Sequence, residues 1–432
     1  MEYEKQNVIR PVPEEMDNSI FIFTIVARNY LGQASVLFDS ITRQCGDIKF
    51  CCFVVDGLDN DTDVPDALRN NVFDCRKLGI PYFEEMAFRY DVVEFSTSLK
   101  PYIFKYIFQS EKYKNAIYLD PDLKLYSDLN WIGEIFKSKS IVVTPHLLDI
   151  EENGAHQTGR IPAINLYSFL MVGTFNFGFV AIKNDTYGAA FVQWWAEILR
   201  DKCFVEISQS LFVDQKWADF LPSFFGEQLE ILRDAGANVA YWNLHERNLT
   251  SDSELNYFVN GSKLKFVHYS SIAITDVDEI SSNIPKSKNI NLITYPEYRE
   301  LFTTYKNELI QAGHHERKIK TPYRFGYFEN GLTINKLQRR IYSRLVKERI
   351  FSNPFSVSGE FYCLLKKNKL LEKQLKLGDF KATDISNLSG KRKVVEFVFF
   401  IMFRLLGTKY YLPMLNEMRR ISNLENNTFL IK

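Results

Sequence analysis

Short apolar runs of strand type alternate with runs of helical type along most of this chain. Residues 19–26, 49–55 and 115–119 are rich in β-branched and aromatic side chains, which is typical of buried strands. Between them, residues 30–43 and 98–108 place apolar side chains at helical spacing. A chain that alternates strands with helices favours a parallel or mixed sheet with helices on both faces. We therefore expect an α/β fold.

The same alternation continues past residue 119 and then stops. Helices are expected at 131–136 and 186–200, and strands at 141–144, 175–182 and 264–268. From about residue 296 onward the pattern is helical. With 432 residues, the chain is long enough for more than one domain. We predict three regions: a polar N-terminal arm (1–18), an α/β domain (19–290) and a basic, mainly helical C-terminal region (291–432).

A net charge of zero hides an uneven distribution of charge. Residues 313–432 hold 24 Lys and Arg against 10 Asp and Glu, whereas the chain as a whole has 53 of each. This basic region contains Lys391-Arg392-Lys393, followed by the apolar run 394–406. The run is too short to span a bilayer but long enough to lie in its interface. We predict peripheral contact with an anionic membrane surface; the alternative is a helix packed on the α/β domain.

Other sequence features narrow the partners and the compartment. The chain shows no zinc-finger, RNA-recognition or helix-turn-helix signature, so nucleic acid is not an expected partner. Residues 1–18 are polar and lack the apolar segment of a secretory signal. The six cysteines show no metal-binding spacing, which fits reduced thiols. We expect a cytoplasmic protein that works at the inner face of the membrane.

Two carboxylates follow directly after the predicted strand 115–119, in the sequence Asp120-Pro121-Asp122. In open α/β sheets, ligands bind at the carboxyl ends of the strands. Residues two apart in an extended chain point the same way, so both carboxylates can face one ion. Mg²⁺ and Mn²⁺ prefer oxygen ligands and often share them with substrate phosphates. An ordinary Asp-Pro turn is the alternative, because both residue types favour turns.

Further segments accompany this Asp-x-Asp motif in a fixed order. They are Phe23-Thr-Ile-Val-Ala-Arg-Asn29, Ser98-Leu-Lys-Pro-Tyr102, Phe175-Asn-Phe-Gly-Phe-Val-Ala-Ile-Lys-Asn184, Asp214-Gln215 and His268-Tyr269. Together with Asp-x-Asp they resemble the GT-A glycosyltransferases, most closely the family 8 retaining nucleotide-sugar transferases of the bacterial surface-glycan type. The resemblance covers roughly residues 19–275.

The resemblance implies both a fold and a set of site residues. The fold would be GT-A, a Rossmann-like mixed sheet with helices on both faces, here with a helical C-terminal appendage. Mn²⁺ or Mg²⁺ would be held by Asp120, Asp122 and His268, and Asp120 would also bind the ribose hydroxyls. The remaining substrate-binding residues would be Thr24, Ala27, Asn29 and Lys100. The residues near the transferred sugar would be Asn176, Asp214 and Gln215, where an amide such as Gln215 can steady positive charge at the anomeric carbon.

The chain departs from the family after His268. Members of the family continue with a Gly and a Lys-Pro-Trp that grips the diphosphate, whereas this chain reads His268-Tyr-Ser-Ser-Ile-Ala-Ile274. We expect Lys100, or the pair Ser270-Ser271, to bind the phosphates instead. A second departure is the stretch 238–247, in which Asn243 and His245 are predicted to form a wall of the substrate site.

Structural roles are the alternatives for several of these residues. His268 could be a hydrogen-bonded core histidine, and Lys100 an exposed lysine in the first turn of a helix. Asp214 could cap a helix that begins near residue 216.

The predicted activity is metal-dependent transfer of a sugar from a nucleotide diphosphate, UDP first, to a hydroxyl of a surface glycan or its lipid-linked precursor. Retention at the anomeric carbon is implied by the resemblance. A nucleotidyltransferase of similar fold would need a Gly-rich loop after its first strand, where this chain has Ala27-Arg-Asn-Tyr30. A phosphatase of the haloacid-dehalogenase type would carry Asp-x-Asp after its first strand, whereas here the motif lies past residue 115. A non-catalytic scaffold that binds glycan or nucleotide stays open.

Overall fold

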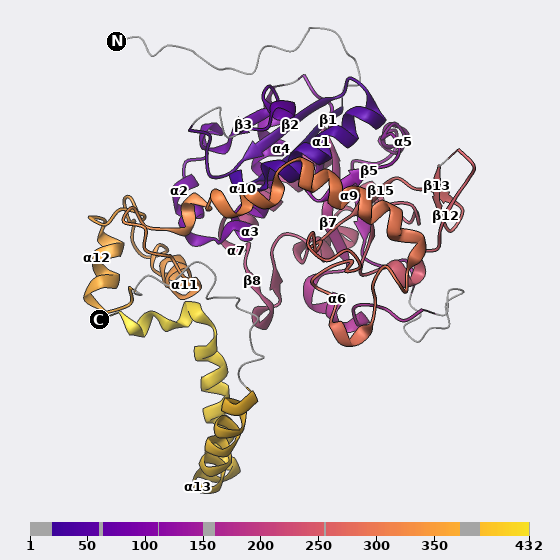
Figure 1. The fold of residues 1–432 in the computed structure, drawn as a ribbon. Coiled ribbons are helices and arrows are strands. Elements are labelled where there is room, and N and C mark those ends of the chain that lie inside the picture. Colours follow the sequence, from indigo (N-terminus) through magenta and orange to yellow (C-terminus); the bar gives the residue numbers. More distant parts are fainter. Residues whose placement is uncertain are drawn as a thin grey trace, which may run out of the picture. The chain divides into compact units, whose positions relative to one another are not determined.

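The computed structural model describes residues 20–59, 64–110, 112–149, 160–254, 256–371 and 389–431, so the predicted arm 1–18 lies outside them. The chain forms two compact units (Figure 1). The first comprises Met1–Phe83 with Val92–Tyr323, and the second Glu84–Asp91 with Arg324–Lys432. The predicted boundary at residue 290 falls inside the first unit, because helix α9 (Arg299–Gln311) packs Leu301, Phe302 and Leu309 into a core of that unit.

A seven-stranded mixed sheet forms the centre of the first unit, in the order β10-β6-β7-β4-β1-β2-β3. All strands run in the same direction except β7, which is antiparallel to both β4 and β6. The predicted mixed α/β architecture is therefore confirmed. The strands are β1 (Ile20–Val26), β2 (Lys49–Val54), β3 (Val72–Asp74), β4 (Asn115–Leu119), β6 (Ile141–Pro145), β7 (Phe175–Lys183) and β10 (Leu229–Ile231).

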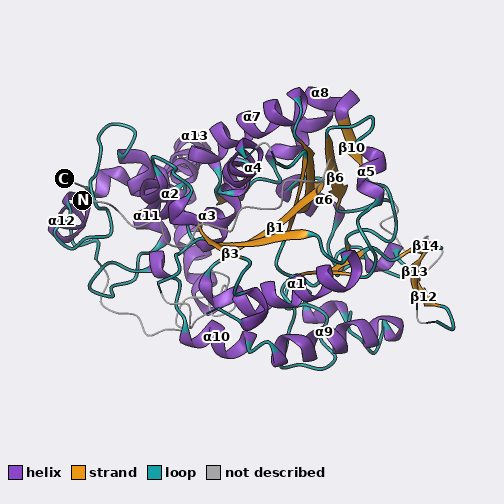
Figure 2. Cartoon of the chain, turned by 90° about the horizontal axis from the view of Figure 1, so that it is seen from above, coloured by secondary structure: helices purple, strands orange, loops and turns teal. Residues whose placement is uncertain are grey.

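Helices cover both faces of this sheet (Figure 2). One face carries α1 (Leu31–Cys45), α9 and α10 (His314–Lys320), and the other carries α3 (Val92–Ser98), α4 (Lys100–Gln109) and α7 (Thr186–Lys202). The helix α1 buries Leu31, Ala34, Leu37 and Ile41, which recur at helical spacing along one side. The shorter helices of this unit are α5 (Trp131–Ile135), α6 (Leu166–Val172) and α8 (Leu221–Phe225).

A second sheet of three strands lies beside the end of β4. It consists of β11 (Val239–Ala240), β15 (Phe266–His268) and β5 (Leu123–Leu125), with β15 at its centre. The predicted strand 264–268 is therefore present, but it pairs in this sheet and not in the main one. Two smaller antiparallel sheets complete the unit: β8 (Val205–Glu206) with β9 (Leu211–Phe212), and β12 (Leu249–Ser251), β13 (Tyr257–Val259) and β14 (Ser262–Lys263).

The second unit is helical, as expected, and is built around Phe88 of α2 (Phe83–Arg89). The rings of Tyr342 and Phe361, from α11 (Lys336–Leu345) and α12 (Glu360–Lys367), pack against Phe88. The buried guanidinium of Arg339 donates hydrogen bonds to the carbonyls of Ala87, Phe88 and Tyr90 at 2.6–3.1 Å. These bonds satisfy both the buried cation and the carboxyl end of α2.

The last helix, α13 (Ser389–Ser422), is interrupted. Gly407 has φ 62° and ψ 171°, outside the helical region, so the element consists of two helical arms. Among the described residues, one stretch, Val395–Ser422, is long and apolar enough to cross a membrane by length and composition. It is longer than the run 394–406 noted in the sequence, because the second arm adds further apolar residues.

Candidate functional site

The loop between β4 and β5 fixes the two carboxylates of the Asp-x-Asp motif. The amide of Asp120 donates to the carbonyl of Gly178 in β7 at 2.7 Å, and the amide of Tyr269 donates to the carbonyl of Asp122 at 2.8 Å. The loop is thus held by the main sheet on one side and by the second sheet on the other. Within the loop, the amide of Leu123 donates to the carbonyl of Asp120 at 3.0 Å, which closes a tight turn.

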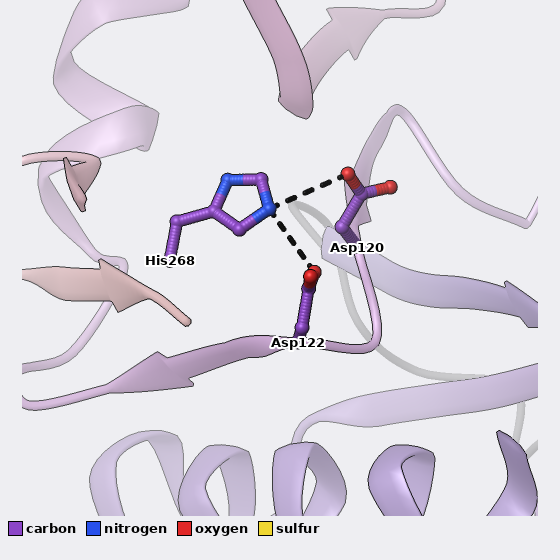
Figure 3. Close-up of side chains that lie close together, drawn as sticks. All are labelled: Asp120, Asp122 and His268. Atoms are coloured by element: carbon purple, nitrogen blue, oxygen red, sulfur yellow. Dashed lines mark ion pairs between the residues drawn. The ribbon is translucent and has the colours of Figure 1, made fainter. Parts of the chain in front are cut away.

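The pairing of β5 with β15 brings the predicted third ligand to the same place. His268 lies opposite Leu123 in this antiparallel ladder, so it meets the two carboxylates directly. The His268 Nε2 atom is 3.0 Å from Asp122 Oδ1 and 3.7 Å from Asp120 Oδ2, and the side chains point toward one another (Figure 3). All three ligand atoms lie within 4.8 Å of one another. Two carboxylates and a histidine in this arrangement can hold a metal ion.

The spacing and chemistry of this cluster suit a small divalent cation. Around an octahedral ion with bonds of about 2.1 Å, neighbouring ligand atoms lie about 3.0 Å apart. The separations of 3.0 and 3.7 Å at His268 Nε2 are close to this spacing. Carboxylate oxygens suit Mg²⁺ and Mn²⁺, and imidazole is acceptable to Mn²⁺ among first-row metals. The three predicted metal ligands are therefore brought together by the fold.

Asn238 and Trp242 orient the imidazole of His268. The Nδ1 atom of His268 lies 3.3 Å from Oδ1 of Asn238, and the ring of Trp242 meets the imidazole edge-on at a centroid distance of 5.2 Å. A proton on Nδ1 would donate to the Asn238 amide and leave Nε2 as the electron-pair donor facing the carboxylates. Such outer contacts fix the ring orientation that metal ligation needs.

Charge coupling favours the ionised forms of Asp122 and His268 despite burial. Burial alone would raise the pKa of Asp122, but the neighbouring His268 charge and hydrogen bond lower that pKa below its ordinary value. For His268, burial alone would lower the pKa, but Asp122 raises it above its ordinary value. A bound cation would take the place of the His268 proton, since metal ligation requires the neutral imidazole.

Gly178 of β7 leaves room for the three side chains. A Cβ atom built on Gly178 would lie 2.5 Å from Cε1 of His268, 2.9 Å from Oδ2 of Asp120 and 2.9 Å from Oδ1 of Asn176. The φ angle of Gly178 is not positive, so the space, and not the backbone conformation, excludes a side chain. The glycine of the sequence Phe175-Asn-Phe-Gly178 is thus part of the site.

Lys100 and Asp214 form a buried ion pair next to the cluster. Lys100 Nζ lies 2.8 Å from Asp214 Oδ2 and donates to the carbonyl of Phe177 at 2.9 Å. The side chains are 4% and 2% exposed. The readings of Lys100 as an exposed first-turn lysine and of Asp214 as a helix cap are both wrong, because the two residues neutralise each other instead. Burial raises the pKa of Asp214 to about 6, although Lys100 opposes this effect.

A ring contact links this ion pair to the metal ligands. The Lys100 Nζ atom lies 4.3 Å from the centroid of the Tyr118 ring, and the Tyr118 hydroxyl donates to Asp120. Asp214, 114 residues along the chain from Lys100, is therefore part of the same buried assembly. Contact of Lys100 with a phosphate stays a prediction.

The predicted amides Asn176 and Gln215 are both held by the protein. Oδ1 of Asn176 accepts from the amide of Gly178 at 3.2 Å and from Nδ2 of Asn238 at 3.3 Å. Nε2 of Gln215 donates to the carbonyl of Val172 at 2.9 Å. The network from Asn176 through Asn238 to His268 places one predicted amide in the surroundings of the metal ligands.

The predicted nucleoside-binding residues follow the neighbouring strand. Strand β1 lies beside β4 in parallel, with Phe23 paired to Tyr118, so Ala27 and Asn29 lie at the same edge of the sheet as Asp120. Oγ1 of Thr24 and Oδ1 of Asn29 are buried and have no hydrogen-bond partner among the described residues. Buried polar atoms normally have partners, so such atoms mark places where a ligand can bind.

Asn243 and His245 are buried in the loop after β11. Oδ1 of Asn243 accepts from the backbone amide of Ala240 at 2.9 Å, and Nδ2 of Asn243 donates to the carbonyls of His146 and Asn238 at 3.1 and 3.0 Å. These bonds fix the conformation of the loop. Contact of Asn243 with the substrate stays a prediction, and so does contact of the buried His245.

Sequence reasoning missed three residues around His268: Asn238, Trp242 and His146. Asn238 adopts φ 52°, a left-handed conformation that Asn tolerates better than most residues. The Nε1 atom of Trp242 is buried without a partner among the described residues, and its ring also packs against His146 at 5.5 Å. His146 follows the carboxyl end of β6, and burial lowers its pKa to about 4, so it is neutral. A histidine directly after a predicted strand was the available signal.

The segment after His268, with Ser270 and Ser271, is fixed by residues that follow it in the chain. The carbonyl of Ser270 accepts from the Ser281 hydroxyl at 2.8 Å. The Ser271 hydroxyl accepts from Asn283 at 3.0 Å, and Ser271 adopts φ 53°. The segment is thus fixed by residues 281–283, and its binding of phosphate stays a prediction.

Comparisons with known proteins give remote relatives. No protein-family model matches the chain. The "Uncharacterized protein YfnF" of Bacillus subtilis (strain 168) is 24% identical over 191 residues, which are 44% of this chain and 60% of that protein. The chain therefore matches less than two thirds of the length of this relative.

Three glycosyltransferases are among the solved structures that are similar in part. The bifunctional glycosyltransferase WbbM has a TM-score of 0.39 and 13% identity, covering 72% of this chain and 53% of its own. The galactosyltransferase LgtC, in complex with donor and acceptor sugar analogs, has a TM-score of 0.39 and 12% identity, covering 66% of this chain and 95% of its own. The glycosyltransferase GlyE of Streptococcus pneumoniae TIGR4 has a TM-score of 0.38 and 14% identity, covering 76% of this chain and 73% of its own. These likenesses are too remote to carry an argument about function, which rests on the side chains.

Proposed function

We propose that this protein is a metal-dependent GT-A glycosyltransferase, similar to family 8, that moves a sugar from a nucleotide diphosphate to a hydroxyl. The observation that carries the proposal is the cluster of Asp120, Asp122 and His268 at the carboxyl ends of β1 and β4. This edge of an α/β sheet is where nucleotide ligands bind. The donor is a UDP-sugar, and the acceptor is a surface glycan or its lipid-linked precursor.

The three ligands would hold Mn²⁺ or Mg²⁺. Such an ion, when bound, supplies positive charge against which the diphosphate leaving group develops its negative charge. Asp120 and Asp122 bring two negative charges to this edge, and a cation shared between them would offset their mutual repulsion. His268 contributes an electron pair without adding a third negative charge.

The donor would extend from the metal ligands along the ends of the neighbouring strands. Thr24 and Asn29 present buried polar atoms without partners, which suits the hydroxyls and the base of a nucleoside. Ala27 between them has a small side chain, so the backbone of the strand end can lie close to the ligand.

The transferred sugar would lie toward the Lys100–Asp214 pair. Asn176 and Gln215 would face its hydroxyls and anomeric carbon, with the amide orientations set by Asn238 and Val172. Lys100 is held in place by Asp214 and by the carbonyl of Phe177, so its ammonium group would have a fixed position relative to the diphosphate. Retention of anomeric configuration belongs to this proposal through the likeness to family 8.

The test is hydrolysis of nucleotide sugars without acceptor, measured as release of free nucleotide from a panel of UDP- and GDP-sugars. We expect turnover of at least one UDP-sugar with Mn²⁺, its loss with EDTA and its recovery on adding excess Mn²⁺. Asp122→Asn should abolish turnover, whereas Asp66→Asn, at a carboxylate that is 89% exposed, should leave it unchanged. Full turnover in EDTA would refute the metal-dependent proposal.

Calorimetry and product assays separate the two alternative functions, a scaffold and a nucleotidyltransferase. A scaffold would bind UDP in calorimetry with or without Mn²⁺ and would release no nucleotide from any sugar donor. A nucleotidyltransferase would release pyrophosphate from UTP and a sugar phosphate, so both substrates belong in the panel.

A further inference from the structure

The arms of α13 expose an unusual number of large apolar side chains. Twelve of them in Val395–Ser422 are 38–80% exposed, counting only residues whose side chains are described. They are Val395, Phe397, Val398, Phe400, Ile401, Phe403, Leu405, Leu406, Tyr410, Leu412, Met418 and Ile421. Soluble proteins rarely leave a contiguous apolar surface of this kind uncovered, so it marks an interaction site.

The end of α13 is attached to the folded core of its own unit. The segment Leu424–Leu430, which follows the second arm, packs on α11, and the Ser343 hydroxyl donates to the buried carboxylate of Glu425 at 3.1 Å. Nδ2 of Asn427 donates to the carbonyl of Ile421 at 2.7 Å, which closes the carboxyl end of the second arm. The apolar arms are therefore part of a structured unit.

The break at Gly407 divides the apolar stretch into pieces that are too short to span a bilayer. The first arm runs from Ser389 to the residue before Gly407. Its apolar part, residues 394–403, measures about 15 Å at 1.5 Å per residue, whereas a bilayer core is about 30 Å thick. The rings of Phe403 and Tyr411, on either side of the break, lie 5.2 Å apart, so the chain turns back on itself there.

Basic residues lie at both ends of the arms and beside the break. The sequence places Lys391, Arg392 and Lys393 near the start of α13, and Arg419 and Arg420 in the last turn of the second arm. Arg404 and Lys409 flank Gly407 and are exposed. Between Val395 and Ser422 the acidic residues are Glu396 and Glu417. An apolar surface framed by positive charge complements an anionic surface.

The distribution of apolar residues favours lipid over a second copy of the chain. Residues 397–403 read Phe-Val-Phe-Phe-Ile-Met-Phe, so apolar side chains surround the first arm on all sides. A partner helix would cover a single stripe, whereas hydrocarbon can cover every side. Two copies would also bring their basic residues together, which like charge opposes.

We propose that α13 lies in the interface of an anionic lipid bilayer, with its arms near the membrane plane and their apolar side chains among the acyl chains. If the turn at Gly407 pointed into the membrane, Arg404 and Lys409 would enter the hydrocarbon, where charged side chains are strongly disfavoured. A flat orientation keeps Arg404, Lys409, Arg419 and Arg420 at the headgroups. This membrane contact does not depend on the proposed transfer reaction, although it would bring an enzyme to a lipid-linked acceptor.

The test is co-sedimentation of the full chain with vesicles of phosphatidylcholine alone and with added phosphatidylglycerol, at low and high salt. Binding should rise with anionic lipid and fall with salt. Arg419→Gln with Arg420→Gln should weaken binding about 25-fold, since each basic residue near the surface contributes about fivefold. Phe397→Asp with Phe400→Asp should weaken it at least about tenfold. The matched control is Lys366→Gln with Lys367→Gln on α12, which removes the same charge outside α13.

A second measurement needs no substitution. Trypsin should cleave after Arg404 and Lys409 in the free protein, because both are exposed, and anionic vesicles should protect these sites. Equal cleavage with and without vesicles, or a protein that stays in the supernatant with every lipid at low salt, would overturn the proposal. An oligomer in lipid-free solution that Phe397→Asp with Phe400→Asp converts to a monomer, without vesicle binding by the parent, would assign the surface to a second copy instead.

Discussion

Replacing Gly178 by Ala should damage the metal site with little change elsewhere. The added Cβ would lie 2.5 Å from Cε1 of His268, whereas non-bonded carbon atoms normally stay about 3.5–4.0 Å apart. The imidazole must therefore withdraw by about 1 Å, and Oδ2 of Asp120 must also move, because it would lie 2.9 Å from the new atom. Two of the three metal ligands are displaced by one methyl group.

The expected effect on Mn²⁺ affinity is a loss of about 10–100-fold, the range found when residues that orient metal ligands are changed. The free energy of unfolding should fall by about 1–3 kcal/mol, as for other overpacked sites. Titration calorimetry with Mn²⁺ and UDP measures the first effect, and chemical denaturation without metal measures the second. The assay therefore separates metal ligation from folding.

Two comparisons make this prediction specific. Gly133→Ala in α5 adds the same methyl group where nothing lies within 4 Å, so its Mn²⁺ affinity should equal that of the parent. In a His268→Ala background the clash with the imidazole is absent, so Gly178→Ala should lose the part of its effect on metal affinity that acts through His268 and keep the part that acts through Asp120. If Gly178→Ala binds Mn²⁺ as tightly as the parent, the three residues do not form the metal site.

Three further perturbations test the surroundings of this site. His268→Ala should weaken Mn²⁺-dependent UDP binding by removing a ligand, and thermal instability with unchanged metal and UDP binding would instead identify a core histidine. Asn238→Gly keeps the left-handed backbone accessible but removes the amide that orients His268, so calorimetry should show Mn²⁺ affinity reduced about 10-fold or more. Lys100→Met should lower the free energy of unfolding by about 3–5 kcal/mol, because Asp214 stays buried without its partner, and denaturation should show that adding Asp214→Asn restores part of the loss.

The raised pKa of Asp214 has a consequence for the pH dependence of stability. Its folded value of about 6 lies above the ordinary 3.8, so the folded protein binds the proton more tightly than the unfolded chain. The stabilising contribution of this proton is fully present below about pH 4 and is lost as pH rises through about 6. Denaturation across this window should show the parent losing stability relative to Asp214→Asn as pH rises. A difference that grows in the opposite direction would mean that the pKa is lowered.

The sequence was sufficient for the strands that carry the site because their patterns are local. The runs that became β1, β4 and β7 are mainly apolar and almost wholly buried, as expected for strands covered on both faces. Asp120 and Asp122 were recognisable because they follow such a strand immediately. His268 was recognisable through the resemblance, and the structure explains its position by the pairing of β15 with β5.

What the sequence did not reveal depends on contacts between distant residues. Lys100 was ambiguous because its partner Asp214 is 114 residues away, and a lysine in a first helical turn is more often exposed. Asn238 orients His268 through its side chain, and its backbone is left-handed. No local sequence pattern predicts either feature. The position of α9 in the first unit depends likewise on a core formed with residues far earlier in the chain.

An irregularity between β6 and β7 joins these local and distant features. Val143 of β6 pairs with Val180 of β7, but the next residue, Thr144, pairs with Asn176, so residues 177–179 of β7 bulge away from β6. Bulges of this kind re-aim side chains and are frequent beside active sites. Here the carbonyl of Gly178 accepts a hydrogen bond from the Asp120 amide at 2.7 Å, and the Gly178 amide donates one to Oδ1 of Asn176.

The direction of β7 gives this bulge its position. Because β7 runs antiparallel to its neighbours, its first residues meet the last residues of β4 and β6 at one edge of the sheet. A parallel strand in the same place would bring its carboxyl end there, with Lys183 near the carboxylates instead of Asn176 and Gly178. The reversal of one strand therefore supplies both the amide and the empty space that the cluster of Asp120, Asp122 and His268 requires.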